Sequence, residues 1–363
     1  MTKLAAQHAI LPGGRSQDGY LYCDVYINGK GPFKIVVDTG CSVGLFVTGK
    51  TADAAGLRPR GSGFMVGFSG QDRARLADAG IVECGPLHLH GVQLVVGDDD
   101  TGQWLGERGI DGLAGLPLFR DVILVLNFPG HRVEAYEVDA WHRPDHGSVK
   151  YRPPLVTIPL NIAGGELPAL VDTGNAYPLM VPGWDRLLFL RPPVETEGLG
   201  AFGIGDGQGR RQRFGQLRGE ATFCHVSLVD PPVFETPPKQ AANIGVGALD
   251  HQVLALDPLN HRLYFCGEET VRKWPVLQYP TSHHRAGYLG VILNGGVRLL
   301  EVDTGGALDR AGLKAGDVIV RVDGQPAEKF QMHHEWEAVS RRTLVVRRRK
   351  KQATVVVDFS DGR

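Results

Sequence analysis

The sequence lacks the features that would place it among membrane or nucleic-acid-binding proteins. No uncharged apolar run among its 363 residues reaches the roughly 18 residues that a membrane-spanning helix needs. The charge is balanced, with 39 lysines and arginines against 40 aspartates and glutamates, so no basic field favours a phosphate backbone. The basic run at 347–351 lies between apolar strand-like residues, which favours an exposed hairpin tip. We therefore expect no transmembrane segment and no nucleic-acid partner.

Cysteine is scarce as well, and no metal-ligand pattern is present. The five cysteines are odd in number and widely spaced, without a CxxC pair or a disulfide framework. The histidine pairs at 283–284 and 333–334 have no acidic or cysteine partner at ligand spacing. We expect no metal and no organic cofactor. The first residues lack the sustained apolar stretch of a signal peptide, so the expected location is cytoplasmic as the chain stands, and periplasmic or secreted if a signal segment is missing.

Glycine and proline, in contrast, are abundant, at 49 and 23 residues. Runs of β-branched residues recur between turn dipeptides, which is typical of a β-rich fold. With 42% hydrophobic and 22% charged residues, the chain has the composition of a globular protein rather than of a mainly disordered one.

Three landmarks occur twice in the sequence, in the same order and at nearly the same spacing. The first is an apolar run that ends in Asp-Thr-Gly, the second a short glycine motif, and the third a strand followed by a turn. The copies are 35–40 and 169–174, 111–116 and 243–246, and 122–133 and 252–263. This repetition predicts a duplicated β-rich lobe.

The repeated triplet places a carboxylate at a tight glycine turn, directly after a buried strand, once in each lobe. If the lobes pack about a pseudo-twofold axis, Asp38 and Asp172 meet at its centre. Two carboxylates that close cannot both ionise at low cost, so the pair retains one proton. One base and one acid around a single water are what general acid–base hydrolysis of a peptide bond requires.

Most of residues 18–266 resembles the pepsin- and retropepsin-like aspartic proteases, in which a carboxylate pair of this kind is well known. The resemblance implies an all-β fold, with duplicated acid-protease β-barrel lobes that form a pseudo-twofold bilobal unit. It also implies that Asp38 and Asp172 activate the water, while Thr39 and Thr173 bond across the lobes and keep the carboxylates coplanar. The supporting glycines of the two loops and of the motifs that cross beneath them are then Gly40, Gly174, Gly115 and Gly245.

The chain departs from that family pattern directly after each triplet and in its flaps. Family members often carry serine or threonine there, whose hydroxyl binds a catalytic carboxylate, whereas this chain has Cys41 and Asn175. Loss of such a donor favours the acid form. A glycine-rich hairpin candidate in each lobe, at 66–70 and 203–207, implies two short flaps over the cleft. The expected flap and substrate-binding residues are Phe68, Ser69, Gly70, Phe202 and Ile204.

Residues 286–363 resemble an α+β PDZ domain of the kind associated with bacterial proteases. The most specific match is 311–317, where a short helix is expected to end at Gly312, followed by a turn and a strand. The resemblance implies that a loop captures the C-terminus of a peptide with its backbone N–H groups, and that the peptide extends along the following strand. The loop residues would be Tyr288, Leu289, Gly290 and Val291.

These features predict a single-chain aspartic endopeptidase with a C-terminal PDZ domain. Its expected partners are a polypeptide substrate and a C-terminal peptide ligand, which is either substrate or regulatory. The alternative from another class is a catalytically silent scaffold that binds peptides in the protease-like cleft and the PDZ groove. The expected divisions are an N-terminal lobe (1–142), a linker (143–154), a C-terminal lobe (155–268), a second linker (269–285) and the PDZ domain (286–363).

Overall fold

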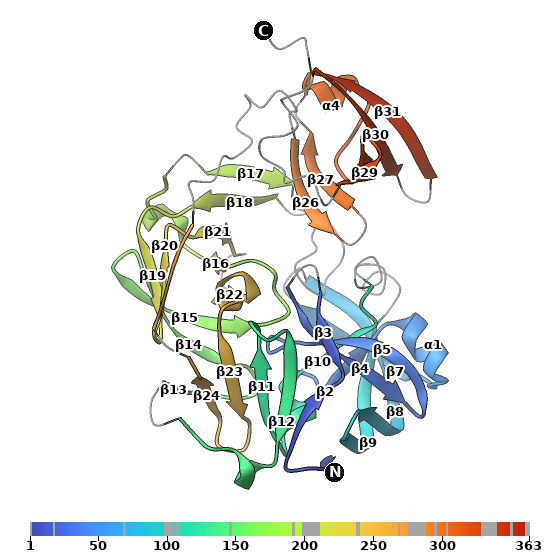
Figure 1. Ribbon diagram of the computed structural model, residues 1–363, viewed down its shortest axis with the longest axis vertical. Coiled ribbons are helices and arrows are strands. Elements are labelled where there is room, and N and C mark those ends of the chain that lie inside the picture. Colours follow the sequence, from blue (N-terminus) through green and yellow to red (C-terminus); the bar gives the residue numbers. More distant parts are fainter. Residues whose placement is uncertain are drawn as a thin grey trace. The chain divides into compact units, whose positions relative to one another are not determined.

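The computed structural model consists largely of β-strands that form four sheets (Figure 1). It describes residues 2–16, 19–67, 70–97, 105, 109–144, 147–190, 193–197, 211–236, 240–267, 269–274, 288–293, 296–302, 304–327, 340–348 and 351–359. The chain divides into two compact units. The first contains the first lobe and most of the second, and the second contains the C-terminal sheet together with strand β17 (Val194–Glu197) and most of β18 (Arg211–Gln216).

The first lobe is a barrel. Its strands lie in the order β1-β9-β6-β10-β5-β4-β8-β7, and an additional pairing of β9 with β8 closes the sheet on itself. Strand β3 pairs with β4 at the side. The bounds are β1 (Thr2–Leu4), β3 (Gly13–Arg15), β4 (Leu21–Ile27), β5 (Lys30–Val37), β6 (Leu45–Val47), β7 (Arg60–Gly67), β8 (Gly70–Cys84), β9 (Leu87–Gly97) and β10 (Gly112–Ala114). Alternating buried positions along β4 match its half-buried place in the sheet.

The second lobe repeats this arrangement. Its sheet has the order β17-β18-β21-β16-β22-β15-β14-β19-β20-β25. In both lobes a central strand pairs in parallel with the strand that leads into the Asp-Thr-Gly triplet and antiparallel with the strand that follows it: β10 lies between β5 and β6, and β22 lies between β15 and β16. The remaining bounds are β14 (Thr157–Ile162), β15 (Gly165–Asp172), β16 (Leu179–Val181), β19 (Glu220–Phe223), β20 (Val226–Val229), β21 (Pro232–Glu235), β22 (Ala242–Gly245) and β25 (Thr270–Lys273).

A third sheet joins the two lobes. Its order is β13-β24-β23-β11-β12-β2, and Figure 1 shows β11 and β23 side by side at its centre. Leu124 of β11 pairs with Leu256 of β23, so the third landmark of the repeat supplies both halves of this sheet. The bounds are β2 (His8–Leu11), β11 (Ile123–Asn127), β12 (Arg132–Tyr136), β13 (Ser148–Lys150), β23 (Val253–Asp257) and β24 (Arg262–Phe265). One continuous apolar core runs through both lobes.

Helices are short in the described residues. The seven-residue helix α1 (Gly49–Ala55) begins at Thr48, whose side chain accepts a hydrogen bond from the Thr51 N–H, and ends at Gly56 in the left-handed conformation. The others are η1 (Leu116–Phe119), η2 (Val138–Ala140), η3 (Trp184–Arg186), α3 (Val246–Leu249) and α4 (Ala307–Arg310). Among these residues, no helix is long and apolar enough to cross a membrane.

The second unit has its own sheet and its own apolar core. The strand order is β26-β27-β28-β30-β31, and β29 pairs with β28. The bounds are β26 (Tyr288–Leu293), β27 (Gly296–Val302), β28 (Val318–Val322), β29 (Gln325–Pro326), β30 (Arg341–Arg348) and β31 (Lys351–Asp358). The helix expected to end near Gly312 is α4, and the described residues of the basic run lie at the end of β30 and the start of β31, where Arg348 pairs with Lys351. The expected all-β fold class is confirmed.

Candidate active site

The two Asp-Thr-Gly triplets meet between the lobes. Each follows a buried strand, and the chain then turns sharply at Gly40 or Gly174. A Cβ atom built on Gly174 would lie 2.5 Å from Oδ2 of Asp38, and one built on Gly40 would lie 2.5 Å from Oδ1 of Asp172. Each glycine therefore leaves the space that the carboxyl group of the opposite lobe occupies.

The threonines of the triplets bind the lobes to each other. The Thr39 hydroxyl donates a 2.6 Å hydrogen bond to the Val171 carbonyl, and the Thr173 hydroxyl donates one of 2.6 Å to the Val37 carbonyl. The backbone N–H of Thr39 donates to Oγ1 of Thr173 at 3.0 Å, and that of Thr173 donates to Oγ1 of Thr39 at 3.1 Å. Both side chains are fully buried, so these four bonds form a reciprocal clasp beneath the carboxylates.

The carboxyl groups of Asp38 and Asp172 lie close together, because each lies against the glycine of the opposite triplet. Each also accepts a bond from a glycine N–H of its own loop, at 2.8 Å from Gly40 and 3.0 Å from Gly174. Burial raises the pKa of both carboxyls, and the charge of Asp172 raises the pKa of Asp38 further. A pair in which one member stays protonated while the other ionises can act as acid and base at once.

Gly115 and Gly245 let a strand pass close beneath each loop. A Cβ atom on Gly115 would lie 2.2 Å from the carbonyl oxygen of Val43, and one on Gly245 would lie 2.2 Å from that of Tyr177. Real Cβ atoms do not approach backbone oxygens so closely, so both positions require glycine. The two positions are equivalent in the lobes.

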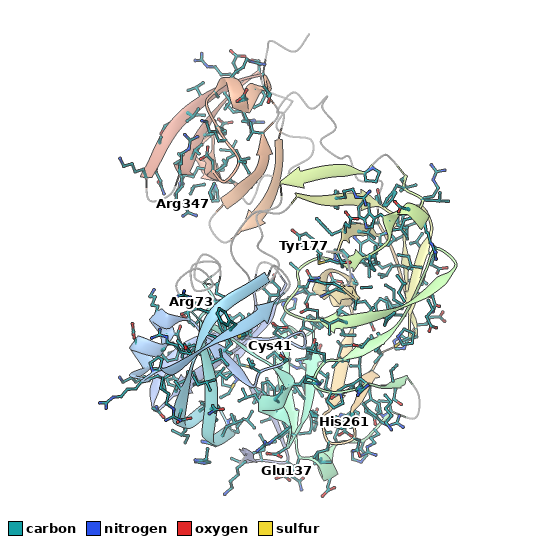
Figure 2. All side chains as sticks on the ribbon, turned by 180° about the vertical axis from the view of Figure 1, so that it is seen from behind. Cys41, Arg73, Glu137, Tyr177, His261 and Arg347 are labelled. Carbon is teal, nitrogen blue, oxygen red and sulfur yellow. The ribbon has the colours of Figure 1, made fainter. Side chains whose placement is uncertain are left out.

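The residue after each triplet behaves differently in the two lobes. Cys41 lies beside the junction of the lobes (Figure 2), where burial raises the pKa of its thiol, and its Sγ donates to the Val43 carbonyl. Asn175 instead donates from Nδ2 to Oδ1 of Asn243 at 2.8 Å. Asn243 in turn donates from Nδ2 to Oδ2 of Asp172 at 2.6 Å.

In the sequence, Asn243 is part of a short glycine motif, and the sequence alone assigns it no role. The sequence signal for such a role is that Asn243 is the one polar residue in an otherwise apolar stretch. By strand register, its counterpart in the first lobe is the apolar Leu113. Among the described residues, no group of three or more histidine, cysteine, aspartate or glutamate side chains could hold a metal ion.

The expected flap residues fall mostly outside the described residues. Strands β7 and β8 form the predicted hairpin of the first lobe, and Gly70 begins β8, whereas Phe68 and Ser69 lie outside. In the second lobe β17 and β18 pair as a hairpin, and Phe202 and Ile204 lie outside.

The four residues expected to form the carboxylate-binding loop of the PDZ domain lie within strand β26. Tyr288, Leu289, Gly290 and Val291 all pair with β27, and the register shifts between Leu289 and Gly290. The strand continues through Ile292 and Leu293, which pair with Val297 and Gly296. Among the described strands, β26 pairs only with β27 and lies at an edge of its sheet.

Two parts of the chain match models of known protein families. A family model described as aspartyl protease matches residues 23–118, which span the first lobe from β4 to η1. A second model, described as PDZ domain, matches residues 299–348. A search of curated proteins found no match. Residues 23–118, which include Asp38, are thus similar to aspartyl proteases, and residues 299–348 are similar to PDZ domains.

Proposed function

We propose that the protein is an aspartic endopeptidase in which a water between Asp38 and Asp172 attacks the peptide bond. The observation that carries this proposal is the reciprocal clasp, in which Thr39 and Thr173 each bond to the backbone that leads into the opposite carboxylate. Under this proposal the second lobe is a diverged copy of the first and completes the site. The division of the chain at 142, 154, 268 and 285 belongs to the same proposal.

The chemistry needs one proton on the pair. The ionised carboxyl removes a proton from the water, whose oxygen adds to the peptide carbonyl carbon, while the protonated carboxyl donates to the carbonyl oxygen. The tetrahedral intermediate then breaks its C–N bond: the nitrogen leaves with a proton from the pair, while a hydroxyl of the intermediate returns a proton to the ionised carboxyl, which restores the single proton of the pair. Gly40, Gly174, Gly115 and Gly245 support the reaction by letting backbone and carboxyl groups approach closely.

The PDZ domain is proposed to bind the C-terminal tail of a polypeptide, either a substrate or a regulator. Its support is the edge position of β26, because an extended peptide can add to an exposed sheet edge through main-chain hydrogen bonds. The flap residues Phe68, Ser69, Gly70, Phe202 and Ile204 are proposed to cover a substrate in the cleft.

Digestion of a mixed peptide library tests the catalytic proposal. Wild-type protein should cut peptides between acidic and neutral pH, while Asp38→Asn and Asp172→Asn should each abolish cutting and keep the fold. A statine-type transition-state mimic should inhibit, and a chelator should not. Near-wild-type turnover by either variant contradicts the proposal that Asp38 and Asp172 together activate the water. A library that is bound but never cut by the wild-type protein would favour the scaffold.

Deletion of residues 286–363 tests the role of the PDZ domain. A tethered groove raises the effective concentration of any chain whose terminus it holds, without affecting the chemical step. The kcat/KM for a full-length substrate should therefore fall, while that for a short peptide stays the same. If the ratio of kcat/KM for the full-length substrate to that for the short peptide is unchanged by the deletion, tethering is excluded. A rise of kcat/KM for both substrates would identify the domain as inhibitory.

A further inference from the structure

We propose that Asn243 is a positioning residue that keeps the shared proton on Asp38 and leaves Asp172 as the general base. This inference rests on the proposed function, because the two carboxyls matter as a pair only if they activate a water. It adds an assignment of roles: Asp172 takes the proton of the water, and Asp38 donates to the peptide carbonyl oxygen.

The first argument is a chain of hydrogen bonds with a fixed direction. It begins at the backbone N–H of Tyr177, which can only donate and reaches Oδ1 of Asn175 at 3.0 Å. The amide of Asn175 must then present Nδ2 to Oδ1 of Asn243, at 2.8 Å. Asn243 is left with Nδ2 toward Oδ2 of Asp172, at 2.6 Å. A backbone group thus determines that Asp172 receives a donor.

The second argument is that the first lobe has no equivalent chain. Leu113 occupies the register position of Asn243 and carries no donor. The Cys41 thiol occupies the position of Asn175 and donates to Val43. Among the described residues, the donors to Asp38 outside the pair are backbone N–H groups of its own loop. The two carboxyls are therefore alike in backbone contacts and differ by one side-chain donor.

Among the described residues, few other charges lie near the pair that could override this difference. The titratable groups that face it are Asp38, Asp172 and the Cys41 thiol, whose raised pKa keeps it neutral. The adjacent strands β6, β10, β16 and β22 consist of residues without a titratable side chain. Burial raises the pKa of Asp172, and the Asn243 bond offsets part of that rise; at Asp38 the neighbouring Asp172 adds to it.

The first test is the pH dependence of kcat/KM for the Asn243→Leu variant. Leucine has a similar volume and is the residue that the first lobe uses at this place. Removal of a donor from the ionised carboxyl raises the pKa of Asp172, so the acid limb of the profile should move to higher pH by about one unit. At a pH below the acid limbs of both the wild-type and the variant profile, kcat/KM of the variant should then be about tenfold lower than that of the wild type.

Two further variants separate positioning from a general loss of packing. Asn243→Gln keeps an amide donor and should retain an acid limb closer to wild type than Asn243→Leu does. Gln252→Leu replaces another buried amide of the second lobe, away from the pair, and should leave the limb unchanged. A wild-type limb in Asn243→Leu, or an equal shift in Gln252→Leu, would overturn the proposal.

Carboxyl titration of the wild-type protein provides a second readout that needs no activity. With 13C-labelled aspartate, assigned through Asp38→Asn and Asp172→Asn, Asp172 should show the signal of the ionised form at lower pH than Asp38. The reverse order would overturn the proposal, even if Asn243→Leu does not fold. A protein that cuts no peptide but titrates in the expected order would disprove the proposed function while keeping the role of Asn243.

Discussion

The threonine clasp allows a prediction of stability that can be worked out bond by bond. Thr39→Val replaces the hydroxyl with a methyl group of similar volume, so it creates no large cavity. The variant loses the bond from the hydroxyl to Val171 and the bond that the N–H of Thr173 donates. Two buried backbone groups lose their partners, at about 1–3 kcal/mol each. Thr173→Val removes the other two bonds of the clasp in the same way.

We therefore expect each valine variant to lower the free energy of unfolding of the first unit by about 2–6 kcal/mol. Thr39→Ser and Thr173→Ser keep the hydroxyl and should cost only about 1 kcal/mol for the lost methyl group. Urea unfolding followed by tryptophan fluorescence measures the difference, since Trp141, Trp184 and Trp274 all belong to the first unit. Equal effects of valine and serine at either position would refute the view that the cross-lobe bonds hold the carboxylates together.

Three other predictions follow from single contacts. Gly174→Ala places a methyl group on the Asp38 carboxyl and should lower kcat/KM at least about a hundredfold, as measured on a short peptide. Arg348→Met leaves the buried carboxylate of Asp317 without its two-pronged partner and should destabilise the second unit by about 2 kcal/mol in thermal unfolding. Burial raises the pKa of Glu134, but its bonds from Arg132, His8 and Tyr136 outweigh this and lower it. Its contribution to stability should thus be present at neutral pH and lost as the pH falls through that lowered pKa, so Glu134→Gln should reduce stability at pH 7 and progressively less as the medium becomes more acidic.

Much of the fold could be predicted because the sequence repeats its landmarks. Two copies of a buried strand with Asp-Thr-Gly, followed in each copy by a glycine motif and a strand with a turn, predict two equivalent lobes. The pairing of Leu124 with Leu256 follows from the same repetition, because equivalent strands meet at a pseudo-twofold axis. The approach of Asp38 to Asp172 has the same origin.

The asymmetry of the pair could not be predicted in this way. Asn243 reads as one polar residue in a motif, and its effect depends on which end of its amide faces Asp172. That orientation is determined by Asn175 and, through it, by the backbone N–H of Tyr177. Only a three-dimensional arrangement fixes the direction of such a chain. The PDZ strand β26 shows a similar limit, because loop and strand residues are not distinguished by composition around Gly290.

Joining both lobes in one chain makes this asymmetry available. In a symmetric dimer of identical chains, any donor beside one carboxyl is repeated beside the other, so the protein alone cannot favour one site for the proton. Here the positions of Leu113 and Asn243 are equivalent in the fold but independent in sequence, and they differ in one donor. A substrate also approaches the pair in one direction only, because its peptide bond is not symmetric. A pair with a fixed base and a fixed acid can therefore be matched to one binding direction before the substrate arrives, which lowers the cost of arranging the proton during the reaction.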